Sequence, residues 1–352
     1  MDKKTVIQLI CIVLLSVVLL FTVITTINVI NEFNPRGMEM LPNDMFNGEE
    51  TEKQTSANDV ESGENVSKND IDLNRYNSNI TLTQAGEYTV TGEFKNTLLV
   101  NTSENVTLIL NGVNIKNAKT AAIANIGMGT LTIKLKENTT NILSDGDSSE
   151  YDACIYSIGP IVIEGNGTLN VYGNQEEGEG IATETNNITI NGGNINIECA
   201  DDGINAGGDG GTIKINGGNV YIKASGDGID SNKNLIINGG NVYTMGSSIG
   251  GDAGIDTDGG FEIHGGDVIA LGSDMLQSPD NSSKQKAVCF NLNSKMQAGV
   301  NISLKNENGE EVVNFEAKED FKTLIISNSK IVTGTYYLYQ NGERTNYSKI
   351  IK

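Results

Sequence analysis

NGGNINIECADDGINAGGDGGTIKINGGNVYIKASGDGIDSNKNLIINGGNVYT, the stretch from Asn191 to Thr244, decides the fold because it repeats itself. Glycines at the second position of each NGG unit, and of the related HGG unit that follows, are 25, 22 and 26 residues apart: Gly192, Gly217, Gly239 and Gly265. A period of this length is typical of a solenoid, in which each repeat forms one coil.

An alternating strand precedes each glycine marker, and another strand follows it. The preceding strands are Ile188–Ile190, Ile213–Ile215, Leu235–Ile237 and Phe261–Ile263. Because strand side chains point alternately to opposite faces, the Ile, Leu and Val residues turn to one side and the Thr, Lys and Asn residues largely to the other. The repeat therefore predicts an all-β fold, a parallel β-helix with an apolar lumen.

Outside the repeat, the composition changes along the chain and predicts four parts. Residues 1–30 are almost wholly apolar, residues 31–70 form a polar, acidic segment, residues 71–272 form the β-helix, and residues 273–352 contain five short strand-like segments. The acidic segment is expected to be a disordered stalk, since it has little that a core can bury. The last part is expected to be a small antiparallel β unit that caps the open end of the last coil.

The N-terminal segment predicts a single membrane anchor. Its apolar run is long enough to span a bilayer, and it lacks the small-x-small site at which a signal peptide is cleaved, so we favour an uncleaved helix over a cleaved signal. Lys3 and Lys4 precede the run and acidic sequence follows it. This charge asymmetry places the protein at the cell membrane, with the bulk of the chain outside the cytoplasm.

The formal net charge is −21 and the composition is poor in aromatic residues. Such a surface repels nucleic acid and attracts divalent cations, so nucleic acid is not expected as a partner. Cys154, Cys199 and Cys289 are widely spaced and odd in number, a pattern that fits neither a disulfide framework nor a zinc site.

A second repeat, of acidic residues, lies between the strand pairs. It reads GEGIAT from Gly178, DDGINA from Asp201, GDGIDS from Gly226 and DAGIDT from Asp252. Equivalent positions of neighbouring coils lie about 4.8 Å apart. Two columns are therefore expected side by side, the first of Glu179, Asp202 and Asp227 and the second of Asn205, Asp230 and Asp256, with Asp201 and Asp252 flanking them.

Carboxylates at this spacing need a counter-charge, because a pair of them repels by about 1 kcal/mol in water and about 3 to 4 kcal/mol at an effective dielectric of 20. Ca²⁺ fits, since it takes six to eight oxygens in flexible geometry. We predict one site at Asp201, Asp202, Asp227 and Asp230, and a second to which Asp252 and Asp256 contribute. The alternative is that Asp-Gly pairs only form the turns of the solenoid.

Tyr221 and Tyr243 occupy equivalent outward positions of successive coils. Aromatic faces pack well on sugar rings, so these tyrosines, with Lys223 and Lys233 nearby in sequence, are the predicted carbohydrate-binding residues. Ordinary cross-strand pairing on a sheet surface is the competing explanation.

The DDGI, GDGI and DAGI units, the NGG strands and the ending TLIISNSKIVTGTYYLY, from Thr323 to Tyr339, resemble a bacterial surface family of carbohydrate-binding domain-containing proteins. The resemblance covers roughly residues 71–342. It implies a right-handed parallel β-helix similar in shape to pectate lyases, an association with Ca²⁺ and acidic plant polysaccharides, and metal ligation by the aspartates named above. Relatives often read DGIK, whereas this chain has Asn205, Asp230 and Asp256 after its Gly-Ile pairs.

These observations favour a tethered binding protein for uronate-rich polysaccharide that depends on Ca²⁺. A pectate-lyase-like enzyme is the first alternative, but a lyase needs a base to remove the proton alpha to the uronate carboxylate, and no residue is assigned to that role. A structural surface β-helix that Ca²⁺ only rigidifies is the second alternative.

Overall fold

The computed structural model describes residues 64–65, 69–146, 150–174, 178–208 and 210–352. The described residues from Glu64 onward form one compact unit. The predicted anchor, residues 1–30, and nearly all of the predicted stalk lie outside the described residues. Within the described ranges, no helix is long and apolar enough to cross a membrane.

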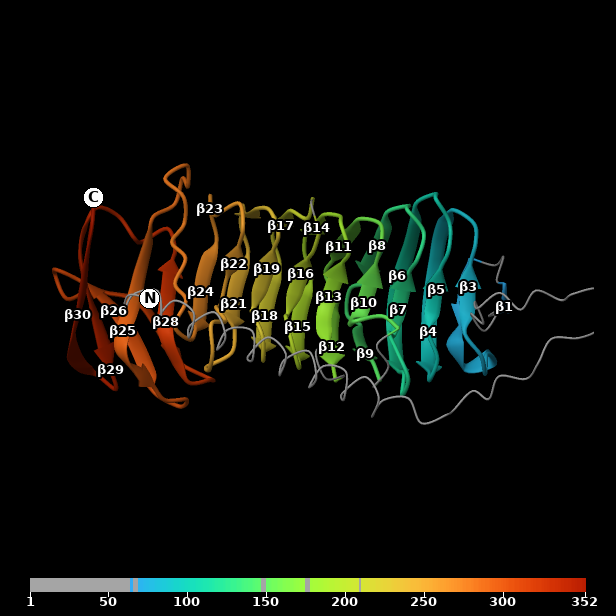
Figure 1. The fold of residues 1–352 in the computed structure, drawn as a ribbon, viewed down its shortest axis with the longest axis horizontal. Coiled ribbons are helices and arrows are strands. Elements are labelled where there is room, and N and C mark those ends of the chain that lie inside the picture. The colour runs from blue at the N-terminus through green and yellow to red at the C-terminus, as the bar shows by residue number, and fades with distance from the viewer. Residues whose placement is uncertain (1–63, 66–68, 147–149, 175–177, 209) are drawn as a thin grey trace, which may run out of the picture. The chain divides into compact units, whose positions relative to one another are not determined.

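The described chain is all-β apart from one short 3₁₀ helix, η1 (Leu73–Arg75). Each coil contributes one strand to a nine-stranded parallel sheet, in which every neighbour comes from the next coil. In order, its strands are β1 (Glu64–Asn65), β3 (Ile80–Leu82), β5 (Leu98–Val100), β7 (Ile123–Asn125), β10 (Ala153–Ser157), β13 (Glu179–Thr183), β16 (Ile204–Ala206), β19 (Ile229–Ser231) and β22 (Asp256–Thr257). Figure 1 shows the successive coils side by side, from the blue strands to the orange ones.

A 17-stranded sheet carries the other strands of the coils. The first row is β2 (Asp70–Asp72), β4 (Gly86–Phe94), β6 (Val106–Lys116), β8 (Leu131–Leu135), β11 (Ile161–Gly165), β14 (Ile188–Ile190), β17 (Ile213–Ile215), β20 (Leu235–Ile237) and β23 (Phe261–Ile263). The second row continues from β6 through β9 (Thr140–Ser144), β12 (Thr168–Gly173), β15 (Asn194–Cys199), β18 (Asn219–Ala224), β21 (Asn241–Met245) and β24 (Asp267–Gly272). All neighbours in these two rows pair in parallel.

Aliphatic side chains stack in the lumen, as the alternation predicts. In the nine-stranded sheet Ile181, Ile204 and Ile229 are register partners on successive coils, and all three are fully buried. Full burial of such a side chain contributes about 1.5 to 3 kcal/mol, so repeated columns of this kind hold the coils together. The right-handed coil sense implied by the resemblance stays a prediction.

Asparagine ladders fix the register at the turns. The Nδ2 atoms of Asn219 and Asn241 each donate to Oδ1 of the equivalent asparagine one coil earlier, at 2.6 Å. A second ladder joins Asn191, Asn216 and Asn238 at 2.8 and 2.7 Å. Each amide satisfies the next, so a shift of register by one residue would break a whole column.

Antiparallel strands close the C-terminal end, as expected for a cap. β28 (Phe321–Ser327) pairs antiparallel with β24 and with β25 (Ala287–Met296), so both extend the solenoid sheet. A separate four-stranded antiparallel sheet contains β27 (Glu311–Glu316), β26 (Asn301–Asn306), β29 (Gly334–Gln340) and β30 (Glu343–Ile351), in that order. The sequence indicated five strands here and missed β30, whose residues are mostly exposed and show no apolar alternation.

Candidate functional site

The predicted stacking of acids is present on the outer face of the nine-stranded sheet. Asn205, Asp230 and Asp256 are register partners on β16, β19 and β22. The same register, extended back past the Gly-Ile pairs, brings Glu179, Asp202 and Asp227 into line. We call the seven acids Glu179, Asp201, Asp202, Asp227, Asp230, Asp252 and Asp256 the carboxylate ladder.

Two ladder aspartates hold the backbone of the following coil, a role that the sequence did not reveal. Oδ1 of Asp202 accepts a hydrogen bond from the backbone N–H of Asp227 at 2.6 Å. Oδ1 of Asp227 accepts in the same way from the N–H of Ala253 at 2.5 Å. Each carboxylate thus satisfies an amide at a corner of the coil, and Oδ2 of Asp202 also accepts a longer hydrogen bond from Nδ2 of Asn205 at 3.4 Å.

Burial and the charges of neighbouring acids raise the pKa values of two aspartates of the ladder. Burial, followed by the charges of Asp201, Asp230 and Asp252, raises the pKa of Asp202 to about 7, against the opposing effect of the N–H bond from Asp227. Burial and its acidic neighbours raise the pKa of Asp227 to about 7 as well. Each carboxylate therefore resists ionisation, first because it is buried and second because other acids are close.

The same effect extends to Asp230 on β19. Burial raises its pKa to about 6, and the charges of Asp227, Asp256 and Asp258 add to the rise. Asp258, which follows β22, was not among the predicted residues. It lies outside the repeated acidic motif, and only the fold brings its charge close to that of Asp230.

Glu179 begins the ladder and is the most deeply buried of its acids. Burial first, and then the charge of Asp152, raise its pKa to about 9. Its Oε1 accepts a hydrogen bond from Nδ2 of Asn205. Oδ1 of Asn205 is itself buried and accepts no hydrogen bond from the described residues. The site thus combines several acids on adjoining coils with a buried carbonyl oxygen that accepts no hydrogen bond from the described residues.

Small residues let the ladder oxygens approach each other. A Cβ atom at Gly226 would overlap Oδ1 of both Asp201 and Asp202, so the glycine leaves the space between coils open. As the described side chains stand, no group of three or more His, Cys, Asp or Glu residues is arranged to hold a metal ion. The register places the carboxylates on adjoining coils, but in the described residues their oxygens do not point to a common centre.

An aromatic pair adjoins the ladder on the same outer face. Tyr156 of β10 lies in the column that runs through Ala182 to Asn205. Its hydroxyl donates to Oε1 of Glu184 at 2.8 Å, and its ring centroid lies 5.0 Å from that of Tyr151 at an angle of 36°. The coil register could have revealed this neighbour, but its coil has Cys154 in place of the glycine of the Gly-Ile pair, so the repeated motif did not include it.

The predicted carbohydrate-binding residues are only partly brought together. Tyr221 and Tyr243 stack with their ring centroids 5.6 Å apart and their planes 10° from parallel, beside a groove of about 360 Å³. Tyr243 also packs edge-on against Phe315 of the C-terminal sheet. Lys223 lies on the same strand as Tyr221, whereas Lys233 is exposed on the turn between β19 and β20.

Comparison with known proteins bears on what such a surface binds. The family model described as carbohydrate-binding domain-containing protein matches residues 76–306. The chain belongs to this family. A carbohydrate-binding domain-containing protein of Acetivibrio thermocellus is 34% identical over 130 residues, which cover 34% of this chain and 44% of that protein. The family member described here thus spans less than half the length of that relative.

A solved structure is also similar to this family member. It is a polysaccharide lyase-like protein from C. thermocellum, 25% identical, and the match covers 60% of this chain and 96% of that one with a TM-score of 0.45.

Proposed function

We propose that this chain is a membrane-anchored, extracytoplasmic protein that binds acidic, uronate-rich polysaccharide through Ca²⁺ held on the carboxylate ladder. The observation that carries the proposal is the stacking of acids on adjoining coils, whose pKa values are raised first by burial and then by the charges of the neighbouring acids. Membership of the family supports a carbohydrate partner. The apolar run in residues 1–30 supports the anchor, and the net charge of −21 disfavours nucleic acid.

The ladder fits Ca²⁺ in charge and in number of oxygens. Asp201, Asp202, Asp227 and Asp230 would hold one ion, and Asp252 and Asp256 would contribute to a second. Ca²⁺ accepts six to eight oxygens, so ligands from the polymer complete the shell that the protein begins. Because the side chains form no ready-made cluster, they have to turn toward the ion as it binds.

Binding is better supported than lyase chemistry, because Lys223, which is near the ladder in sequence, is unsuited to act as the base. Nζ of Lys223 lies 3.2 Å from Glu198 and 3.1 Å from Glu319, on a different sheet from the ladder. The hydrogen bonds to Glu319 and Glu198 raise the pKa of Lys223, which keeps it protonated. A base that removes a proton has to be neutral first.

A structural role for the ladder is the second candidate. The hydrogen bonds from Asp227 N–H to Asp202 and from Ala253 N–H to Asp227 favour it, since they show these acids holding coil to coil. In that case Ca²⁺ would stiffen the solenoid without contacting a polymer.

Retention on immobilised polygalacturonate tests the proposal. The full-length protein is applied with Ca²⁺ or with EDTA, and ultraviolet absorbance from unsaturated product is followed in parallel. The test variant carries Asp202→Asn and Asp227→Asn, which keep an acceptor for each backbone N–H. The matched control carries Glu137→Gln and Glu307→Gln, which remove two charges from exposed acids elsewhere.

Retention that needs Ca²⁺, fails in the ladder variant and persists in the control is the expected result. Rising absorbance would replace binding with lyase activity. Calcium-dependent stabilisation without any retention would leave the structural role as the better account.

A further inference from the structure

A pocket near the N-terminal end of the solenoid arises from an incomplete first coil. β2 pairs only with Thr89–Thr91 of β4, and the chain then leaves the sheet through η1. The end of β4 therefore has no strand beside it on that edge among the described residues. Oδ1 of Asn74 replaces the missing strand at one point, where it accepts a hydrogen bond from Glu93 N–H at 3.2 Å. A hollow of about 510 Å³ remains.

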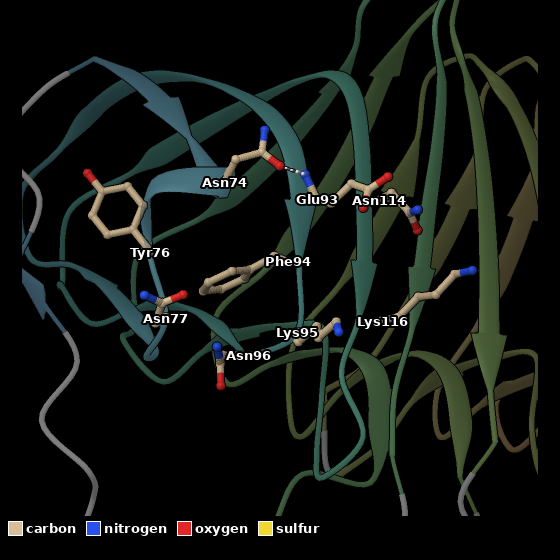
Figure 2. Close-up of a pocket in the computed structure, with 9 residues that line it drawn as sticks. All are labelled: Asn74, Tyr76, Asn77, Glu93, Phe94, Lys95, Asn96, Asn114 and Lys116. Carbon is tan, nitrogen blue, oxygen red and sulfur yellow. Dashed lines mark hydrogen bonds between the residues drawn. The ribbon is translucent and has the colours of Figure 1, made fainter.

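The lining of this pocket combines aromatic rings, amides and ammonium groups. Figure 2 shows the Phe94 ring between Tyr76 and the side chains of Lys95 and Lys116. Phe94 is only 4% exposed and belongs to the core, so it forms a firm floor, while the half-buried Tyr76 forms a wall. Rings placed in this way suit the apolar face of a sugar.

One lining amide lacks a partner. Asn114 lies opposite Glu93 in the register of β4 and β6. Its Oδ1 is buried and accepts no hydrogen bond from any described residue. A buried carbonyl oxygen is normally satisfied, and a rotation of the Asn114 side chain would present this unpaired atom to a hydroxyl group of a bound molecule.

The charge of the pocket contrasts with that of the protein. Phe94 and Ile115 are register partners, so Lys95 and Lys116 follow one another on adjoining coils. Neither lysine forms an ion pair with a described residue. With Glu93, the lining carries two positive charges and one negative, a net +1 in a chain of −21. Two neighbouring ammonium groups attract an anion between them.

We infer that this pocket is a second saccharide site, which binds a uronate residue directly and without a metal ion. The carboxylate of the sugar lies against Lys95 and Lys116, a hydroxyl donates to Asn114 Oδ1, and the ring packs on Tyr76. The inference rests on the proposed function for the class of polymer only. It uses none of the ladder residues, and it makes the chain a two-point binder of one acidic glycan.

Titration calorimetry with trigalacturonate in EDTA tests the pocket, because EDTA removes any contribution from a bound cation. The full-length protein is compared with a variant carrying Lys95→Gln and Lys116→Gln. The matched control carries Lys136→Gln and Lys214→Gln. Lys136 follows β8 and Lys214 lies on β17; both are exposed and form no ion pair among the described residues. We expect the pocket variant to lose affinity by about tenfold or more, and the control to stay close to the wild type.

Failure to bind trigalacturonate in EDTA overturns the inference, and so does an equal loss of affinity in the pocket variant and the control. Maltotriose, a neutral oligosaccharide, is expected to bind far more weakly, and equal affinity for it would refute the role of the lysines. Calcium-dependent retention on polygalacturonate is measured on the same preparations. Its absence would reject the proposed function of the ladder while leaving the pocket result standing.

Discussion

Replacing Asp202 by asparagine separates the charge of the ladder from its hydrogen bonds. The carboxamide matches the carboxylate in size, and its Oδ1 can still accept the N–H of Asp227, which now lies 2.6 Å away. The change therefore removes a negative charge and the long hydrogen bond, at 3.4 Å, that Oδ2 accepts from Nδ2 of Asn205. In EDTA we expect the Asp202→Asn protein to be more stable than the wild type.

The size of the gain follows from the acidity of Asp202. A rise in its pKa from 3.8 to about 7 corresponds to about 4 kcal/mol at most, since each pKa unit represents about 1.36 kcal/mol. The side chain is partly exposed, and solvent screening reduces this to about 1 to 2 kcal/mol. Asp202→Ala removes the same charge but strips Asp227 N–H of its acceptor, which costs about 1 to 3 kcal/mol. The alanine variant should therefore be the less stable of the two.

Urea unfolding followed by circular dichroism at about pH 8, where the carboxylates of an unfolded chain are ionised, measures these differences. In EDTA the free energy of unfolding should be larger for Asp202→Asn than for the wild type, and larger for Asp202→Asn than for Asp202→Ala. Ca²⁺ at 100 times its Kd should stabilise the wild type by about 2.7 kcal/mol and the asparagine variant by clearly less. An asparagine variant that is no more stable than wild type in EDTA would refute the idea that the charge of Asp202 destabilises the folded protein.

Three further outcomes follow from the structure. Four ladder acids have folded pKa values above their ordinary ones, so the folded chain binds more protons: in EDTA the thermal midpoint should fall as the pH rises from about 4 through 9, and added Ca²⁺ should flatten that fall. Ile229→Ala, in the middle of a lumen column, should lower the free energy of unfolding by about 2 to 5 kcal/mol in urea. Lys223→Met breaks two exposed ion pairs and should change that free energy by less than about 1 kcal/mol, so a larger loss would show that Glu319 fastens the cap.

The repeat predicted the solenoid and its register because both depend on local alternation and on a constant period. Asn205, Asp230 and Asp256 became neighbours as expected. These residues lie in regular coils, where one step along the sequence corresponds to one step around the coil. The predicted metal and sugar contacts stay predictions.

Features that depend on irregular coils or on distant segments escaped the sequence. Tyr156 joins the column of Asn205 through Ala182, but its coil has Cys154 where later coils have the glycine of the Gly-Ile pair, so the motif did not point to it. Lys223 meets Glu319 only because the C-terminal strands fold back, and nothing near Lys223 in the sequence foretells that contact. The pocket at Phe94 exists because β2 is short, and a strand that stops early leaves no mark in the composition.

The antiparallel pairing of β28 with β24 has a consequence for how such chains can lengthen. A strand that runs in the opposite direction offers no template for another parallel turn, so growth by gene duplication has to occur between interior coils. A duplicated interior segment would meet the same neighbours above and below, and would add about 4.8 Å to the stack. The number of ladder rungs is thus open to evolution while both ends stay unchanged.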